Sequence, residues 1–155
     1  VDTCIDVDSR LYRIYKIMVK ETIYGTIPSK SNSYTVGRVN GHSCIVKSNE
    51  MKRYERSFVK QCSLYKGKNI STPFRLVADV FYPDYTHDLD NSLKGLLDCL
   101  QYVGAISNDN LCVEISAKRH YDRVYPRVEY SIEEIHEQMR LFDNGKYGLP
   151  GRNRD

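Results

Sequence analysis

The stretch from residue 72 to residue 103 constrains the fold most, because it places a strongly apolar strand directly before a leucine-rich helix. Residues 72–82 (TPFRLVADVFY) are rich in aromatic and β-branched side chains, which favours a strand. From Leu89 to Val103 the leucines recur at helical spacing and form one apolar stripe, and Gly104 closes the helix. We therefore expect this stripe to anchor the helix on a sheet that contains the strand.

The N-terminal half predicts a strand, a hairpin and a second helix. Residues 11–24 are rich in Tyr, Ile and Val and indicate a strand, which the polar run at 27–33 breaks into a loop. A hairpin is expected across 34–46, with its turn at Asn40-Gly41. Residues 49–65 place apolar side chains at helical spacing, and Ser48 or Asn49 can cap this helix.

The C-terminal part predicts two strands and a third helix. The strands are expected at 111–117 and 127–130. Residues 131–134 (SIEE) have the pattern of a capping box, which predicts a helix with an apolar stripe of Ile132, Ile135, Met139 and Phe142. Asn144-Gly145 would end that helix, and we expect a disordered tail over 146–155. The predicted fold is a single α+β domain over residues 1–145, with a mixed β-sheet packed against two to three helices.

The composition is that of one globular domain. A chain of 155 residues can bury a core, and no apolar run approaches the roughly 18–20 residues that span a bilayer. The first residues have neither the basic nor the apolar region of a signal peptide. Five cysteines are an odd number and include no CxxC pair, which argues against a zinc site and a disulfide framework. We expect a cytoplasmic protein with reduced thiols and no membrane contact.

The charge is unevenly distributed although the net value is only +3. Basic residues dominate the segments 47–60 and 118–127, whereas four aspartates and one lysine lie between 84 and 98. Five acids and one arginine lie between 129 and 143. Basic blocks beside a concentrated acidic patch suit a metal-using nuclease, which needs cations for phosphates and carboxylates for the ion. Charge patches are also common on solvated faces, so this pattern is a weak indication by itself.

Asp88 and Asp90 stand at the start of the leucine-rich helix, and Lys94 follows one turn after Asp90. One interpretation is that both acids cap the helix and complement its dipole. One acid suffices for a cap, however, and two close carboxylates repel each other unless a cation or a proton lies between them. Mg²⁺ is commonly held by one or two carboxylates, so the pair also predicts a magnesium site.

Other carboxylate motifs fit this segment less well. An EF-hand loop that began at Asp88 would require Gly and Glu where the chain has Leu93 and Cys99. A phosphoaspartyl hydrolase would carry its Asp-x-Asp after an apolar strand near the chain start. The sequence has no P-loop, GxSxG or HExxH motif.

The acidic segment resembles the central motif of the RusA family of Holliday junction resolvases. That motif begins Asp-Leu-Asp-Asn, has Lys on the next helical turn and Gly at the helix end, and then an acidic pair before a strand. Pro28 to Ser33 (PSKSNS) is similar to the family's Pro-Ser-rich loop. The chain departs from the family at His87, often Arg there, and at Asn108, often acidic there. The matching residues are Asp88, Leu89, Asp90, Asn91, Lys94, Asp98, Leu100, Gly104, Asn108, Asp109 and Val113.

The resemblance implies a RusA-like fold and a homodimer that resolves four-way junctions by paired symmetric nicks in DNA recombination and repair. It implies that Asp88, Asp90 and Asp109 bind Mg²⁺, with Mn²⁺ as a substitute, and that Lys94 is needed for cleavage. No small-molecule cofactor is expected. The resemblance also makes a bacterial, phage or prophage origin plausible. The basic clusters supply most of the DNA-binding candidates, and the family-like Pro-Ser loop and the position before Asp88 supply the others. The candidates are Lys30, Lys52, Arg56, Lys60, His87, Arg119 and Arg123.

Three other functions fit part of the pattern. A protein with the same fold could bind branched DNA without cutting it. The presence of all four expected catalytic residues argues against this loss of activity. A metal-dependent phosphohydrolase for small phosphate esters or nucleotides would not need the basic blocks. A structural protein with an acidic helix cap would show no metal effect.

The origin of the third carboxylate in the site also stays open. The helix carries the chain about 22 Å from Asp88, and the six residues from Val103 to Asp109 span at most about 20 Å. Asp109 could therefore complete the site of its own chain or that of a partner.

Overall fold

A four-stranded mixed sheet forms the centre of the protein, in a computed structural model that describes residues 19–135. The sheet has the order β1-β6-β4-β5, in which β4 and β5 are parallel and the other neighbours antiparallel. Its strands are β1 (Glu21–Tyr24), β4 (Phe74–Tyr82), β5 (Cys112–Tyr121) and β6 (Arg127–Glu134). The single α+β domain with a mixed sheet is therefore confirmed.

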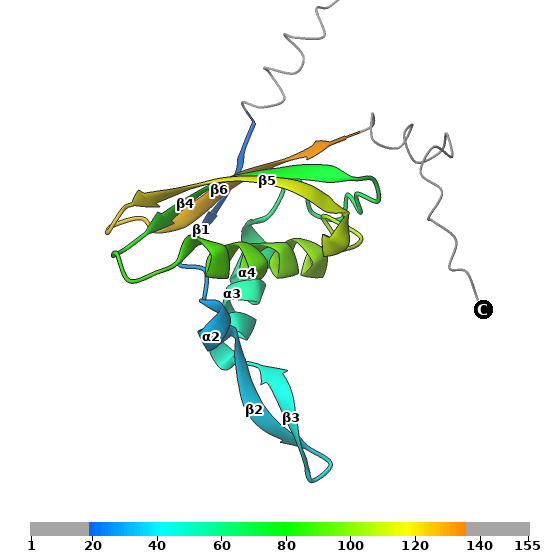
Figure 1. The fold of residues 1–155 in the computed structure, drawn as a ribbon, viewed down its shortest axis with the longest axis vertical. Helices are drawn as coiled ribbons and strands as arrows, with labels where there is room; N and C mark the ends of the chain where they lie inside the picture. Colours follow the sequence, from blue (N-terminus) through cyan, green and yellow to red (C-terminus); the bar gives the residue numbers. More distant parts are fainter. Residues whose placement is uncertain (1–18, 136–155) are drawn as a thin grey trace, which may run out of the picture.

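Two helices cover one face of this sheet (Figure 1). The first is α3 (Asn49–Gln61), which starts where the Ser48 hydroxyl accepts a hydrogen bond from the Met51 amide at 3.1 Å. The second is α4 (Leu89–Tyr102), the crossover between the parallel strands β4 and β5. A short helix α2 (Lys30–Ser33) lies beside both, and the 3-10 turn η1 (Asp109–Leu111) precedes β5.

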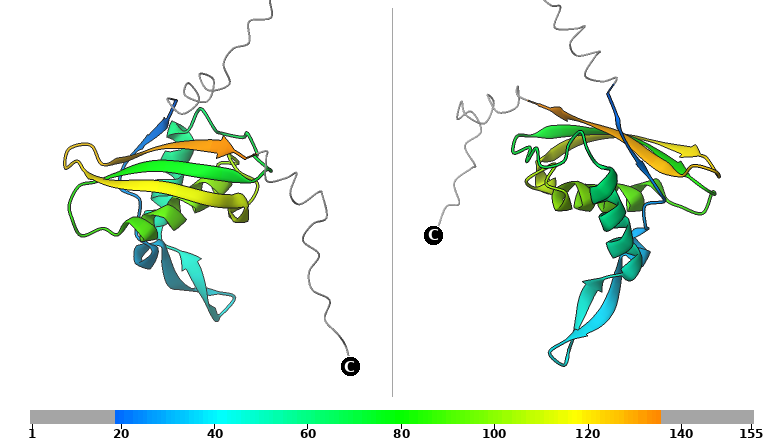
Figure 2. Two further views of the ribbon diagram at one scale, coloured as in Figure 1. Left: turned by 45° about the horizontal axis from the view of Figure 1, so that its top comes forward. Right: turned by 180° about the vertical axis from the view of Figure 1, so that it is seen from behind.

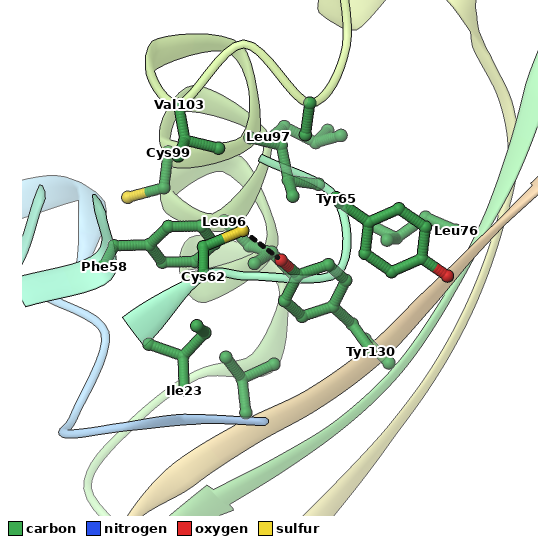
Figure 3. Packing of buried hydrophobic residues seen from close by; sticks show 14 of the residues in the cluster. Ile23, Phe58, Cys62, Tyr65, Leu76, Leu96, Leu97, Cys99, Val103 and Tyr130 are labelled. Carbon is green, nitrogen blue, oxygen red and sulfur yellow. Dashed lines mark hydrogen bonds between the residues drawn. The ribbon is translucent and has the colours of Figure 1, made fainter. Parts of the chain in front are cut away.

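Strand β4 has its two faces sharply separated, because every second residue from Phe74 to Tyr82 is buried. The buried side chains meet apolar residues of both helices, and Tyr130 of β6 stacks on Phe58 of α3 with ring centroids 6.0 Å apart. Cys62 lies 3.5 Å from the Tyr130 hydroxyl in the same core (Figure 3). Cys62 and Cys99 are both buried.

A two-stranded hairpin projects from the body beyond α2 and α3 (Figures 1 and 2). It consists of β2 (Tyr34–Val39) and β3 (His42–Lys47). The turn has positive φ at Asn40 (51°) and Gly41 (82°), the pair of angles that a type I′ turn requires. The predicted hairpin and its turn are therefore confirmed.

Glu21 of β1 is buried and ties that strand to the segment that follows α3. Its carboxylate accepts hydrogen bonds from the amides of Ser63 (3.2 Å), Leu64 (2.5 Å) and Tyr65 (3.3 Å). The Ser63 hydroxyl donates a further bond at 3.3 Å. One side chain thus satisfies three backbone donors of the segment after α3, which have no helical partner.

Several expected boundaries differ from the structure. The loop predicted at 27–33 contains the short helix α2, and α3 ends at Gln61 rather than at 65. Residues 131–134 do not open a helix, because they continue β6, where Ile132 pairs with Leu76 and Glu134 pairs with Phe74. Antiparallel pairing with the central strand thus prevails over the local capping pattern.

The remaining expectations for the chain ends lie outside the described residues. These are the strand over 11–18, Cys4, the helix from 136 onward and the tail over 146–155. Within residues 19–135, no helix is long and apolar enough to cross a membrane.

Candidate metal and nucleic-acid site

The start of α4 is fixed to the end of β4 by hydrogen bonds of one tyrosine. The Tyr82 hydroxyl donates to Ser92 Oγ at 2.7 Å and lies 3.3 Å from the Asp88 carbonyl oxygen. Ser92 is buried, and its hydroxyl lies 3.3 Å from the same carbonyl. This clamp uses the backbone of Asp88 and leaves its carboxylate exposed to solvent.

The carboxylates of Asp88 and Asp90 form neither a capping hydrogen bond nor an ion pair among the described residues. Asp88 is the N-cap residue of α4, yet its side chain makes no capping hydrogen bond and accepts a long one from the Asn91 side-chain amide, at 3.4 Å. Neither carboxylate pairs with a cation among residues 19–135. Burial raises the pKa of Tyr82, and the charges of Asp88 and Asp90 raise it further, so both act on the same hydroxyl. Helix capping therefore does not account for this acidic pair.

Lys94 joins α4 to the turn that precedes β5. Its ammonium contacts Asp109 and lies 3.1 Å from an Asp98 oxygen. The hydrogen bond to Asp109 raises the pKa of Lys94, and the same bond lowers the pKa of Asp109. Asp109 thus returns to α4 of its own chain, one helical turn beyond Asp90.

The return path is held by backbone bonds to the segment before β4. The Asn69 amide donates to Gly104 O at 2.8 Å, and the Ile70 amide donates to Ala105 O at 2.9 Å. Asn108, where the family often has an acid, uses its side chain to accept from the Asn110 amide at 3.0 Å. The residue that departs from the family pattern therefore caps η1.

The three expected metal ligands do not form one cluster in this conformation. Among the described residues, no three Asp, Glu, His or Cys side chains are close enough to hold a single ion. Asp88 and Asp90 lie together at the start of α4, whereas Asp109 contacts Lys94. Because Mg²⁺ commonly uses one or two carboxylates and completes its shell with water and phosphate, the unpaired donors Asp88 and Asp90 fit that ion.

The loop between β4 and α4 is held in place by its own polar side chains. Asp84 accepts from the hydroxyl and the amide of Thr86, and these bonds lower the pKa of Asp84 to about 2. His87 lies 3.0 Å from the same carboxylate and stacks on Tyr82 with centroids 5.2 Å apart. His87 is therefore half-buried and engaged in the loop, which leaves its predicted role in DNA binding without direct support.

The basic candidates lie on two separate surfaces. Lys52, Arg56 and Lys60 are exposed on α3, opposite the side chains that enter the core. Arg119 and Arg123 are exposed at the end of β5 and in the loop after it. Lys30 is the first residue of α2.

Several side chains at this site were missed from the sequence. Tyr82 and Ser92 position the helix, and the Tyr34 hydroxyl of the hairpin donates to Asp98 at 3.2 Å. The chain has thirteen tyrosines in 155 residues, which indicates that tyrosine hydroxyls could form hydrogen bonds at the site. The sequence does not indicate which hydroxyl bonds which partner.

The comparison with protein families identifies the class of this protein as an endodeoxyribonuclease. The model described as endodeoxyribonuclease RusA matches residues 25–133, which include the hairpin, both long helices and the whole acidic segment. The chain therefore belongs to the RusA family, whose members are nucleases that act on Holliday junctions. No curated protein matches the chain.

Charge reversal on the two basic surfaces is expected to weaken junction binding. If Lys52→Glu or Arg119→Glu removes one phosphate contact, the negative slope of log affinity against log salt concentration should become shallower by about one. The matched control is Lys68→Glu, an exposed lysine outside both basic segments. Titrations of a labelled junction at several salt concentrations measure this slope. An unchanged slope in both variants would show that these cations face solvent only.

Proposed function

We propose that this protein is a Mg²⁺-dependent, homodimeric endonuclease that resolves Holliday junctions by paired symmetric nicks during recombination and repair. The observation that carries the proposal is the pair of unpaired carboxylates at the start of α4, with Lys94 one turn away. Family membership supports the nuclease activity and the branched DNA substrate. A cytoplasmic location and a bacterial or phage origin belong to the same proposal.

Asp88 and Asp90 are the residues that would hold Mg²⁺, and Asp109 would join them as the third carboxylate after it exchanges its contact with Lys94. When bound, the ion would polarise the scissile phosphate, favour hydroxide over water and stabilise the leaving oxygen. Mn²⁺ would accept the same oxygen ligands.

Lys94 is suited to neutralise the charge that grows on the phosphoryl oxygens. Its ammonium contacts Asp98 of α4 and Asp109 of η1, so it is held between these two elements before DNA binds. Asp98 and Asp109 are half-buried, whereas the Lys94 side chain is 49% exposed, so phosphate oxygens can reach the ammonium from solvent. Asp98 and Asp109 therefore orient the Lys94 side chain without fixing it in one position.

The symmetry of the substrate supports the dimer. A four-way junction is nearly two-fold symmetric, and its resolution requires nicks in opposed strands. A two-fold dimer presents two identical sites at a fixed separation, as dimeric DNA-binding proteins do for palindromic operators.

A gel assay on a labelled four-way junction tests the proposal directly. We expect symmetric nicks with Mg²⁺, no cleavage with EDTA, and little cleavage of a linear duplex of the same sequence. Binding without cleavage in Mg²⁺ and in Mn²⁺ would favour the non-cleaving junction binder. Inhibition by nucleotides at concentrations that leave DNA binding unchanged, together with nucleotide hydrolysis, would favour the phosphohydrolase.

A further inference from the structure

Two tyrosines form an exposed parallel stack at the end of the parallel strand pair. Tyr85 lies in the loop after β4 and is 76% exposed, and Tyr121 ends β5 and is 48% exposed. Their ring centroids are 4.8 Å apart and their planes differ by 8°. Val124 and Tyr125, in the next loop, are also exposed. These aromatic rings therefore present flat surfaces to solvent and are not part of the hydrophobic core.

The stack is held by contacts that lead to the backbone of Asp88 at the start of α4. The Arg119 guanidinium donates to the Tyr85 carbonyl at 2.8 Å and lies over the Tyr82 ring, 5.6 Å from its centroid. Tyr82 in turn bonds the Asp88 carbonyl. The ring of Tyr85 thus belongs to a loop whose two ends are fixed, one to β5 and one to the start of α4.

The position of the stack places it beside the acidic pair. Tyr85 precedes Asp88 by three residues, which span at most about 10 Å of chain. The loop that contains Tyr85 and the loop after Tyr121 lie at the same end of the sheet as the start of α4 (Figure 1). Arg119 and Arg123 supply exposed positive charge near them. Aromatic faces flanked by cations are the combination that binds unpaired nucleobases and their phosphates.

We propose that Tyr85 and Tyr121 form a stacking platform for a nucleobase that the branch point exposes next to the cleaved phosphate. This inference rests on the proposed junction-resolving function. A base would lie on the free outer face of the stack, while Arg119 and Arg123 contact the adjoining phosphates. The bases of an intact duplex have both faces covered by neighbours, so the platform selects branched DNA over linear DNA.

The test compares DNA binding by Tyr85→Ser and Tyr121→Ser, measured in EDTA so that cleavage does not interfere. We expect each variant to bind a four-way junction about tenfold more weakly and a linear duplex nearly as well as the unmodified protein. The salt slope should stay unchanged, because all the phosphate-binding cations are kept. Tyr85→Phe keeps the ring and should bind normally. The control is Tyr102→Ser, a 57% exposed tyrosine at the opposite end of α4.

A fluorescent base gives a readout that a structural role would not change. With 2-aminopurine at the branch point, the unmodified protein should quench its fluorescence by stacking, and both serine variants should not. Circular dichroism spectra and melting temperatures close to those of the unmodified protein exclude misfolding.

The outcomes separate this inference from the function on which it rests. If the unmodified protein neither binds nor cuts junctions, the proposed function is wrong and the platform has no substrate. If it binds and cuts while both serine variants keep full junction selectivity, only the platform is refuted. A shift of the variants from dimer to monomer in sedimentation would also refute it, because the stack would then be a contact between copies of the chain.

Discussion

Asp90→Asn is expected to reduce junction cleavage by about a thousandfold while binding is kept or improved. The substitution removes one metal-binding carboxylate, and such an ion is worth roughly 4 kcal/mol of transition-state stabilisation, or about three powers of ten in rate. It also removes a negative charge that faces phosphate, so affinity should not fall. Single-turnover cleavage and gel-shift titrations of one junction measure the two effects separately.

The matched control for this prediction is Glu50→Gln. Glu50 is an exposed acid in the first turn of α3, as Asp90 is in the first turn of α4, so both changes remove the same helix-dipole interaction. Only the change in α4 should affect cleavage. Substantial residual cutting by Asp90→Asn, in preparations free of contaminating nuclease, would refute the catalytic assignment.

Glu21→Ala is expected to lower the free energy of unfolding by about 3 kcal/mol, with a fall in melting temperature of about 10 °C. The carboxylate satisfies the amides of Ser63, Leu64 and Tyr65, and alanine would leave these donors without a partner. Glu21→Gln keeps one acceptor oxygen and should be less destabilising. Urea denaturation monitored by circular dichroism gives the free energies.

The control for this stability prediction is Glu114→Ala. Glu114 pairs with Arg75 on the surface of β5 at 3.2 Å, and its side chain is 55% exposed. An exposed pair of this kind contributes at most about 1 kcal/mol. A similar destabilisation in both variants would mean that the carboxylate of Glu21 has no special role.

Much of the fold could be predicted because the relevant signals are local. The alternation in β4, the stripe of α4 and the turn at Asn40-Gly41 each depend on residues close in sequence. The same holds for the acidic segment, whose spacing over one helix and one turn indicates the family. For the same reason the sequence limited the cap of α3 to Ser48 or Asn49, and the structure shows that it is Ser48.

The features that could not be predicted depend on distant partners. Residues 131–134 have a helix-capping pattern, and only their pairing with the distant strand β4 makes them a strand. Glu21 is likewise an ordinary acid in sequence until Ser63, Leu64 and Tyr65 surround its carboxylate. Chain length alone could not show whether Asp109 returns to α4 of its own chain, where it contacts Lys94, or to the site of a partner chain.

The β2–β3 hairpin is anchored at its base and free at its tip. Tyr34 and Lys47 are cross-strand partners at the base; the tyrosine bonds Asp98 and the lysine contacts Glu55. The pairing register is therefore set where the hairpin leaves the body, and the turn at Asn40-Gly41 only closes it. Two extra residues in each strand would lengthen the hairpin by about 7 Å without disturbing the core, because the alternation of side chains and of hydrogen-bonded pairs is then kept. The distance to which the β2–β3 hairpin projects can thus be changed by insertion independently of the rest of the fold.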